Sequence, residues 1–180
     1  MFSSRKPFLA AALVTSLTSL SAFAGLRPFI VGGENATKGE FPFIVSLQDS
    51  SGDHFCGGSL IRSHWVLTAA HCVTEGSPAK VVIGLLDRSR PDAQTESFSI
   101  RQTIVHPKND PQNMNFDFAL LELSGDSKFA PVPLNAEEIR GATDFVTAGW
   151  GTTSDGGFSL PNMLQKVTVP WVSDDICAKA

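Results

Sequence analysis

The 180-residue sequence has no cluster of basic side chains and, beyond its first residues, no repeat and no long hydrophobic run. Its formal net charge is −4, from 14 Lys and Arg against 18 Asp and Glu. Binding to nucleic-acid phosphates needs a basic patch, so we expect no nucleic-acid partner. The histidines, cysteines and carboxylates also lack the spacing of metal ligands. We therefore predict no metal and no cofactor.

The first 24 residues differ in composition from the rest. Arg5 and Lys6 precede a segment without charged side chains, and residues 22–24 (Ala-Phe-Ala) have the small side chains typical of a signal-peptide cleavage site. A membrane anchor is the alternative, but a spanning helix needs about 20 mostly apolar residues, and serines and threonines interrupt this segment. We predict a signal peptide over residues 1–24, secretion to an extracellular or periplasmic location, and no membrane association after its removal.

The cysteine count is small and odd. An exported protein with three cysteines, Cys56, Cys72 and Cys177, is expected to form one disulfide and to keep one unmatched thiol.

Short segments rich in β-branched and aromatic residues alternate with Gly, Pro, Asp and Ser along the chain, as is typical of antiparallel all-β barrels and sandwiches. The predicted strands are 41–48, 55–61, 65–68, 80–85, 96–105, 116–123, 130–134, 144–150 and 164–172. The pattern breaks at residues 124–128. About six strands therefore precede the break, and the two or three that follow are too few to close a barrel.

Asp117 lies within an apolar stretch, residues 115–123. Burial of an unpaired carboxylate there would cost on the order of several kcal/mol. A period of two places Asp117 on the same face as Ala119 and Leu121. Asp117 either caps a turn or accepts a hydrogen bond from a donor such as an imidazole.

His71 follows the apolar strand at 65–68 and precedes Cys72. It is either a hydrogen-bonded core histidine or a general base whose tautomer is fixed by a carboxylate. The other histidines near turns, His54 and His64, are predicted to be solvated.

Five ordered motifs resemble those of the trypsin/chymotrypsin-like serine endopeptidases. They are Ile-Val-Gly-Gly at 30–33, Cys-Gly-Gly-Ser-Leu-Ile at 56–61, Thr-Ala-Ala-His-Cys at 68–72, Phe-Asp-Phe-Ala-Leu-Leu at 116–121 and Ala-Gly-Trp-Gly at 148–151. The resemblance implies an all-β, chymotrypsin-like double β-barrel, with a complete first barrel at 30–123 and a linker plus an incomplete second barrel at 124–180. It also implies a secreted zymogen that hydrolyses protein or peptide substrates through an acyl-enzyme and has protein inhibitors as further partners.

The same resemblance implies roles for single residues. His71 would be the general base and Asp117 the carboxylate that orients it, while Cys56 and Cys72 would form the disulfide beside the histidine. Ile30 would become the N-terminus once an activating protease removes a propeptide, residues 25–29, by cleaving after Phe29, where the family usually has Arg or Lys.

The family's Gly-Asp-Ser-Gly-Gly segment, which carries the nucleophile, is absent from the 180 residues. Residues 154–157 (Ser-Asp-Gly-Gly) have another order and fall in a surface loop of the family. We therefore expect a C-terminally truncated chain that is inactive alone, with Cys177 unpaired because its family partner lies further on. A non-catalytic protease-like binding module or a degraded gene product is the alternative. Leu85 replaces the glutamate of calcium-binding members, so no calcium is expected.

Overall fold

The computed structural model describes residues 33–137, 139, 143–153 and 159–179. The predicted signal peptide, the propeptide, Ile30 and the segment 154–157 lie outside the described residues. Within them the chain forms two antiparallel sheets and two helices of four residues each, α1 (His71–Thr74) and α2 (Asp174–Cys177). Neither helix has the length and apolar character needed to cross a membrane, and the described part of the chain holds no other helix that does.

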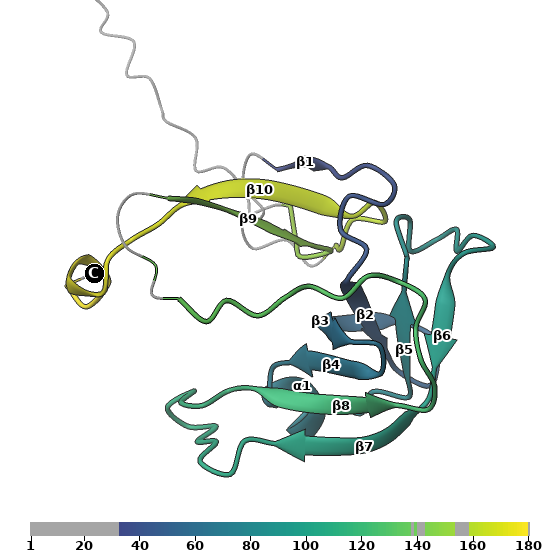
Figure 1. Cartoon of the computed structure of the whole chain (residues 1–180), viewed down its shortest axis with the longest axis horizontal. Helices are drawn as coiled ribbons and strands as arrows, with labels where there is room; N and C mark the ends of the chain where they lie inside the picture. Colours follow the sequence, from purple (N-terminus) through teal and green to yellow (C-terminus); the bar gives the residue numbers. More distant parts are fainter. Residues whose placement is uncertain (1–32, 138, 140–142, 154–158, 180) are drawn as a thin grey trace, which may run out of the picture.

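The larger sheet has seven strands in the order β6-β5-β2-β3-β4-β8-β7 (Figure 1). Their bounds are β2 (Ile44–Gln48), β3 (His54–Arg62), β4 (Trp65–Thr68), β5 (Lys80–Ile83), β6 (Glu96–Phe98), β7 (Ile100–Val105) and β8 (Ala119–Leu123). Only Ser99 separates the two edge strands, β6 paired with β5 and β7 paired with β8. The predicted single strand at 96–105 therefore bends at Ser99 and joins the two edges, which closes the sheet on itself as a barrel.

The smaller sheet has three strands in the order β1-β10-β9. These are β1 (Glu34–Asn35), β10 (Gln165–Pro170) and β9 (Asp144–Gly149), and Figure 1 shows them together on one side of the seven-stranded sheet. The residues of β1, near the start of the described chain, thus pair with a strand 130 positions later. The described architecture confirms the all-β, chymotrypsin-like fold class with a partial second barrel.

One predicted strand does not form. Residues 130–134 run as an extended connection without a β ladder. Pro131 and Pro133 have no backbone N–H, so alternate positions cannot donate to a neighbouring strand. A single hydrogen bond, from Val132 N to Leu60 O at 2.9 Å, fixes the connection to the larger sheet.

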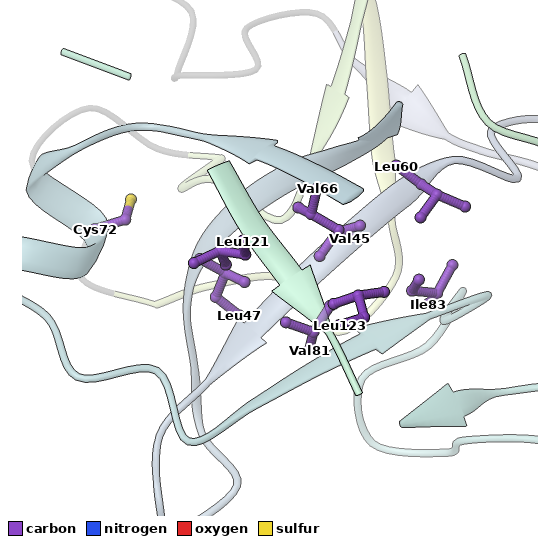
Figure 2. Close-up of a cluster of buried hydrophobic side chains, with 9 residues drawn as sticks. All are labelled: Val45, Leu47, Leu60, Val66, Cys72, Val81, Ile83, Leu121 and Leu123. Atoms are coloured by element: carbon purple, nitrogen blue, oxygen red, sulfur yellow. The ribbon is translucent and has the colours of Figure 1, made fainter. Parts of the chain in front are cut away.

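The interior of the seven-stranded sheet holds the main hydrophobic core (Figure 2). Along β8 the alternating residues Ala119, Leu121 and Leu123 are buried, as the period of two predicted. The buried members of this cluster, here called the barrel core, are Val45, Leu47, Leu60, Val66, Cys72, Val81, Ile83, Leu121 and Leu123.

A second, smaller cluster connects the two sheets. Its buried members, here called the junction cluster, are Ala36, Val82, Leu85, Trp150 and Leu164. Val82 comes from β5 of the larger sheet, whereas Trp150 and Leu164 flank β9 and β10 of the smaller one. The smaller sheet is therefore packed against the outside of the barrel.

Arg88 reinforces this junction with hydrogen bonds. Its Nε donates to Pro161 O and its Nη2 to Leu160 O, each at 3.0 Å. Its backbone N donates to Asn162 O at 2.9 Å. One arginine thus ties the loop after β5 to the three residues that approach β10.

Candidate active site

His71 is positioned by the end of β4 and the start of α1. β4 ends at Thr68, whose Oγ1 donates to Gly57 O of β3 at 2.7 Å. The neighbouring Gly58 allows the two strands to approach closely, because a Cβ there would lie 2.9 Å from Leu67 O and from Val66 Cγ1. After β4, Ala69 and Ala70 connect to α1, and His71 is the first residue of this helix.

Asp117 forms two hydrogen bonds with His71. Its Oδ2 lies 2.7 Å from His71 Nδ1, and its Oδ1 accepts the backbone N–H of His71 at 2.9 Å. The side chain of Asp117 is 18 % exposed and that of His71 45 %. Of the two sequence interpretations of Asp117, the structure contains the hydrogen bond between the carboxylate and an imidazole, and it adds a second one from the backbone N–H of His71.

The hydrogen bond from the His71 side chain, followed by that from the His71 backbone, lowers the pKa of Asp117. The carboxylate is accordingly ionised at neutral pH. An ionised acceptor beside Nδ1 favours the tautomer that carries its proton on Nδ1 and leaves Nε2 as the basic nitrogen.

The loop before β8 holds Asp117 in place. Phe116 has a positive φ of 52°, a left-handed conformation that is uncommon for a bulky residue. Its carbonyl accepts a hydrogen bond from Asn109 Nδ2 at 3.3 Å. The His106 ring stacks on Phe116 with centroids 4.9 Å apart and contacts Phe118 at 4.6 Å. His106 thus packs against both neighbours of Asp117 and restricts where the carboxylate can lie.

A disulfide joins Cys56 of β3 to Cys72 of α1, with Cα atoms 6.1 Å apart and a sequence separation of 16. Closing a loop of this length stabilises the fold by roughly 3 kcal/mol in the chain-entropy model. Cys72 Sγ lies 3.5 Å from His71 Nε2. The two sulfurs and a ring nitrogen of His71 cluster within 4.8 Å, but sulfurs joined in a disulfide offer no thiolate to a metal ion.

His71 lines two cavities. The larger, about 490 Å³, lies between β3, the disulfide and the segment from Ala148 to Gly151, and Leu160 also lines it. The smaller, about 210 Å³, is bounded by Asp117, Glu75 and Met114. His71 therefore borders both cavities, and each of them has room for part of an extended ligand.

The sequence interpretation predicted a solvated His54, whereas the structure shows this residue half-buried. Its Nδ1 shares a hydrogen bond of 2.8 Å with Ser46 Oγ, and its ring meets Trp150 edge-on at 5.2 Å. Burial, followed by the charge of Arg88, lowers the pKa of His54 to about 4. Trp150 comes from a segment nearly a hundred residues away, so no local pattern shows that it covers His54. His64, by contrast, lies 2.9 Å from Asp126 at the surface.

The structure describes two of the remaining residues singled out from the sequence, Cys177 and Leu85, and neither lines the cavities beside His71. Cys177, in α2, is exposed with a free thiol, and Ile30 lies outside the described residues. Leu85 is buried in the junction cluster.

The sequence matches the profile of the trypsin family over residues 30–180. The chain belongs to the trypsin family. It is 38% identical over 160 residues to Trypsin-1 of Astacus astacus, covering 82% of this chain and 67% of that protein. It is 37% identical over 158 residues to trypsin Blo t 3 of Blomia tropicalis, covering 83% of this chain and 58% of that protein. It is also 37% identical over 158 residues to Ovochymase-2 of Mus musculus, covering 82% of this chain and 26% of that protein.

The trypsin-family fold is also found among solved structures. Human heparin binding protein superposes with a TM-score of 0.73 and 34% sequence identity, covering 81% of this chain and 67% of that one. These similarities confirm the predicted serine-protease family. The chain spans between 26% and 67% of the lengths of these relatives.

Proposed function

We propose that this chain is the histidine- and aspartate-bearing part of an exported serine endopeptidase. The observation that carries the proposal is the pair of hydrogen bonds between Asp117 and His71, at 2.7 Å to the ring Nδ1 and at 2.9 Å to the backbone N. A neutral imidazole has one N–H donor and one acceptor nitrogen. Here one carboxylate fixes both the backbone and the ring, while the ring itself lines a 490 Å³ cavity.

In the proposed reaction His71 removes a proton from a serine hydroxyl that attacks the substrate carbonyl carbon. His71 later gives that proton to the leaving amine, which leaves an acyl-enzyme that water hydrolyses. Asp117 holds the ring and stabilises the imidazolium, and it stays ionised because the hydrogen bonds from His71 lower its pKa. The Cys56–Cys72 disulfide restrains the turn that carries the histidine.

We place the nucleophile outside this sequence, since the 180 residues contain no Gly-Asp-Ser-Gly-Gly segment. The oxyanion hole would come from the same part of the protein. An activating protease would cleave after Phe29, the substrates would be proteins or peptides, and protein inhibitors would contact the same cavity. Export rests on the composition of residues 1–24.

The alternative, a binding module without catalysis, is less well supported. The human relative is named for heparin binding, but this chain has a net charge of −4, which gives a polyanion little electrostatic attraction. A module without catalysis would also not need the His71–Asp117 pair, whose proposed role is proton transfer.

A fluorophosphonate probe, which labels an activated serine, tests the proposal. The purified 180-residue chain is expected to remain unlabelled. A longer form that includes a Gly-Asp-Ser-Gly-Gly segment should be labelled at that serine, with labelling abolished by His71→Ala. Labelling of the 180-residue chain that disappears in His71→Ala would contradict the placement of the nucleophile, and labelling of the longer form unchanged by His71→Ala would contradict the role of His71.

A further inference from the structure

Residues 35–37, Asn-Ala-Thr, are the only Asn-x-Ser/Thr sequence in the 180 residues, and they begin in β1 at the edge of the three-stranded sheet. We propose that Asn35 is an N-glycosylation site, modified as the chain enters the secretory pathway of a eukaryotic cell. This inference rests on the export that forms part of the proposed function.

The local structure presents the site outward. Asn35 and Thr37 are exposed, whereas Ala36 between them is 4% exposed and belongs to the junction cluster. The buried alanine anchors the segment to the fold and leaves the two residues of the acceptor motif at the surface. Sugars linked to Asn35 would therefore extend into solvent and displace no core side chain.

The hydrogen bonding of Asn35 is compatible with a linked sugar. Gln165 Nε2 donates to Asn35 Oδ1 at 2.6 Å, and within the described residues Asn35 Nδ2 donates no hydrogen bond. A side-chain amide has one acceptor oxygen and two N–H donors. Glycosylation replaces one hydrogen on Nδ2 and leaves Oδ1 unchanged, so the bond from Gln165 survives the modification.

The transfer needs a co-reactant, a lipid-pyrophosphate-linked oligosaccharide supplied by the host cell. The bond that forms joins Asn35 Nδ2 to C1 of the first sugar. The bond that breaks joins this C1 to the pyrophosphate oxygen, the lipid pyrophosphate leaves with the bonding electron pair, and Nδ2 loses one proton.

The position of Asn35 gives the sugar a physical role without obstructing His71. β1 is an edge strand, and an uncovered edge exposes backbone groups that can pair with another chain. A bulky, hydrated sugar at this edge would hinder such pairing. None of residues 34–40 lines either cavity beside His71, and Figure 1 shows β1 on the outer side of β10.

The test is expression of the whole chain, with its own first 24 residues, in cultured eukaryotic cells. The secreted chain should run with a single upward shift in gel mobility that an N-glycan-removing amidase reverses, leaving aspartate at position 35 in the peptide mass spectrum. Asn35→Gln and Thr37→Ala should each lose the shift. Thr37→Ser, which keeps the hydroxyl, and Asn135→Gln, which changes an exposed asparagine outside the motif, should retain it.

The result that overturns the inference is a secreted chain with no amidase-sensitive shift, or a shift that survives in both Asn35→Gln and Thr37→Ala. A chain retained in the cytosol would instead contradict the proposed export, and the modification with it. Protection of the chain from added protease inside isolated microsomes separates these two failures.

Discussion

The two sheets differ in how they bury their apolar side chains. Eight buried side chains of the seven-stranded sheet form one continuous cluster with Cys72 of α1, the sheet closes through Ser99, and a disulfide adds a covalent restraint. In the three-stranded sheet and the segment after it, large apolar side chains stay exposed, namely Val146 (57%), Val169 (38%), Val172 (49%) and Ile176 (63%). Among the described residues, the buried apolar side chains that pack with the smaller sheet belong to the junction cluster, which it shares with the barrel.

We infer that the smaller sheet depends on contact with the barrel through the junction cluster, whereas the barrel has its own core and disulfide and does not depend on the smaller sheet. Both His71 and Asp117 are held by elements of the barrel. The geometry of the pair should therefore persist when the smaller sheet is weakened. The predictions below test that difference.

The largest expected effects come from matched truncations in the two clusters. Leu47 is 0% exposed in the barrel core and Leu164 is 2% exposed in the junction cluster. A buried Leu→Ala change costs about 2–5 kcal/mol. By hydrogen exchange, Leu47→Ala should lower protection throughout the chain, whereas Leu164→Ala should lower it only in β1, β9 and β10. Equal loss in the barrel for both variants would contradict the proposed independence.

Removal of the disulfide should be the next largest effect. Cys56→Ser with Cys72→Ser opens the loop between β3 and α1 and should reduce the free energy of unfolding by roughly 3 kcal/mol in a denaturant titration. Cys177→Ser, at an exposed free thiol, is the control and should leave the midpoint unchanged. A disulfide variant as stable as the control would show that the Cys56–Cys72 bond does not stabilise the fold.

A smaller effect is expected at the junction. Arg88→Ala removes two side-chain hydrogen bonds to the carbonyls of Leu160 and Pro161, a loss of about 1–3 kcal/mol. Increased hydrogen exchange should be confined to the smaller sheet. Arg90→Ala is the matched control, since that side chain is 86% exposed and forms an ion pair with Asp87 at 3.5 Å. Equal effects of the two variants would show that Arg88 does not hold the sheets together.

The last expected effect is a pH dependence at the junction. Because burial lowers the pKa of His54 from 6.5 to about 4, the unfolded chain binds this proton more readily than the folded one. The stabilisation of the folded chain by neutral His54 is therefore fully present above pH 6.5. The free energy of unfolding falls as the pH drops from 6.5 towards 4, and below pH 4 this group causes no further change. Denaturant titrations of His54→Asn should lack this slope, while His64→Asn should keep it. A slope that persists in His54→Asn would assign it to another group.

Local patterns in the sequence predicted the barrel well. Apolar and β-branched composition identified β4, and a period of two gave the buried face of β8. An aspartate in an apolar stretch offered a partnered carboxylate as one of two interpretations. The resemblance to the family added the pairing of Cys56 with Cys72, which the structure contains.

Features that depend on contacts between distant segments could not be predicted in this way. Trp150 buries His54 across the junction, and the two residues of β1 pair with β10, neither of which leaves a periodic signal. The prediction of a strand at 130–134 was wrong because apolar composition was weighed above the two prolines, which remove the donors a ladder needs.

The central claim is that the barrel alone assembles the His71–Asp117 pair. Proton NMR of the 180-residue chain tests it directly, through the imidazole proton held between His71 Nδ1 and Asp117 Oδ2, which are 2.7 Å apart. We predict a slowly exchanging low-field imidazole signal that persists in Leu164→Ala and disappears in Asp117→Ala while the backbone spectrum of the barrel is retained. A folded chain in which the signal is absent, or is unchanged by Asp117→Ala, would contradict the account.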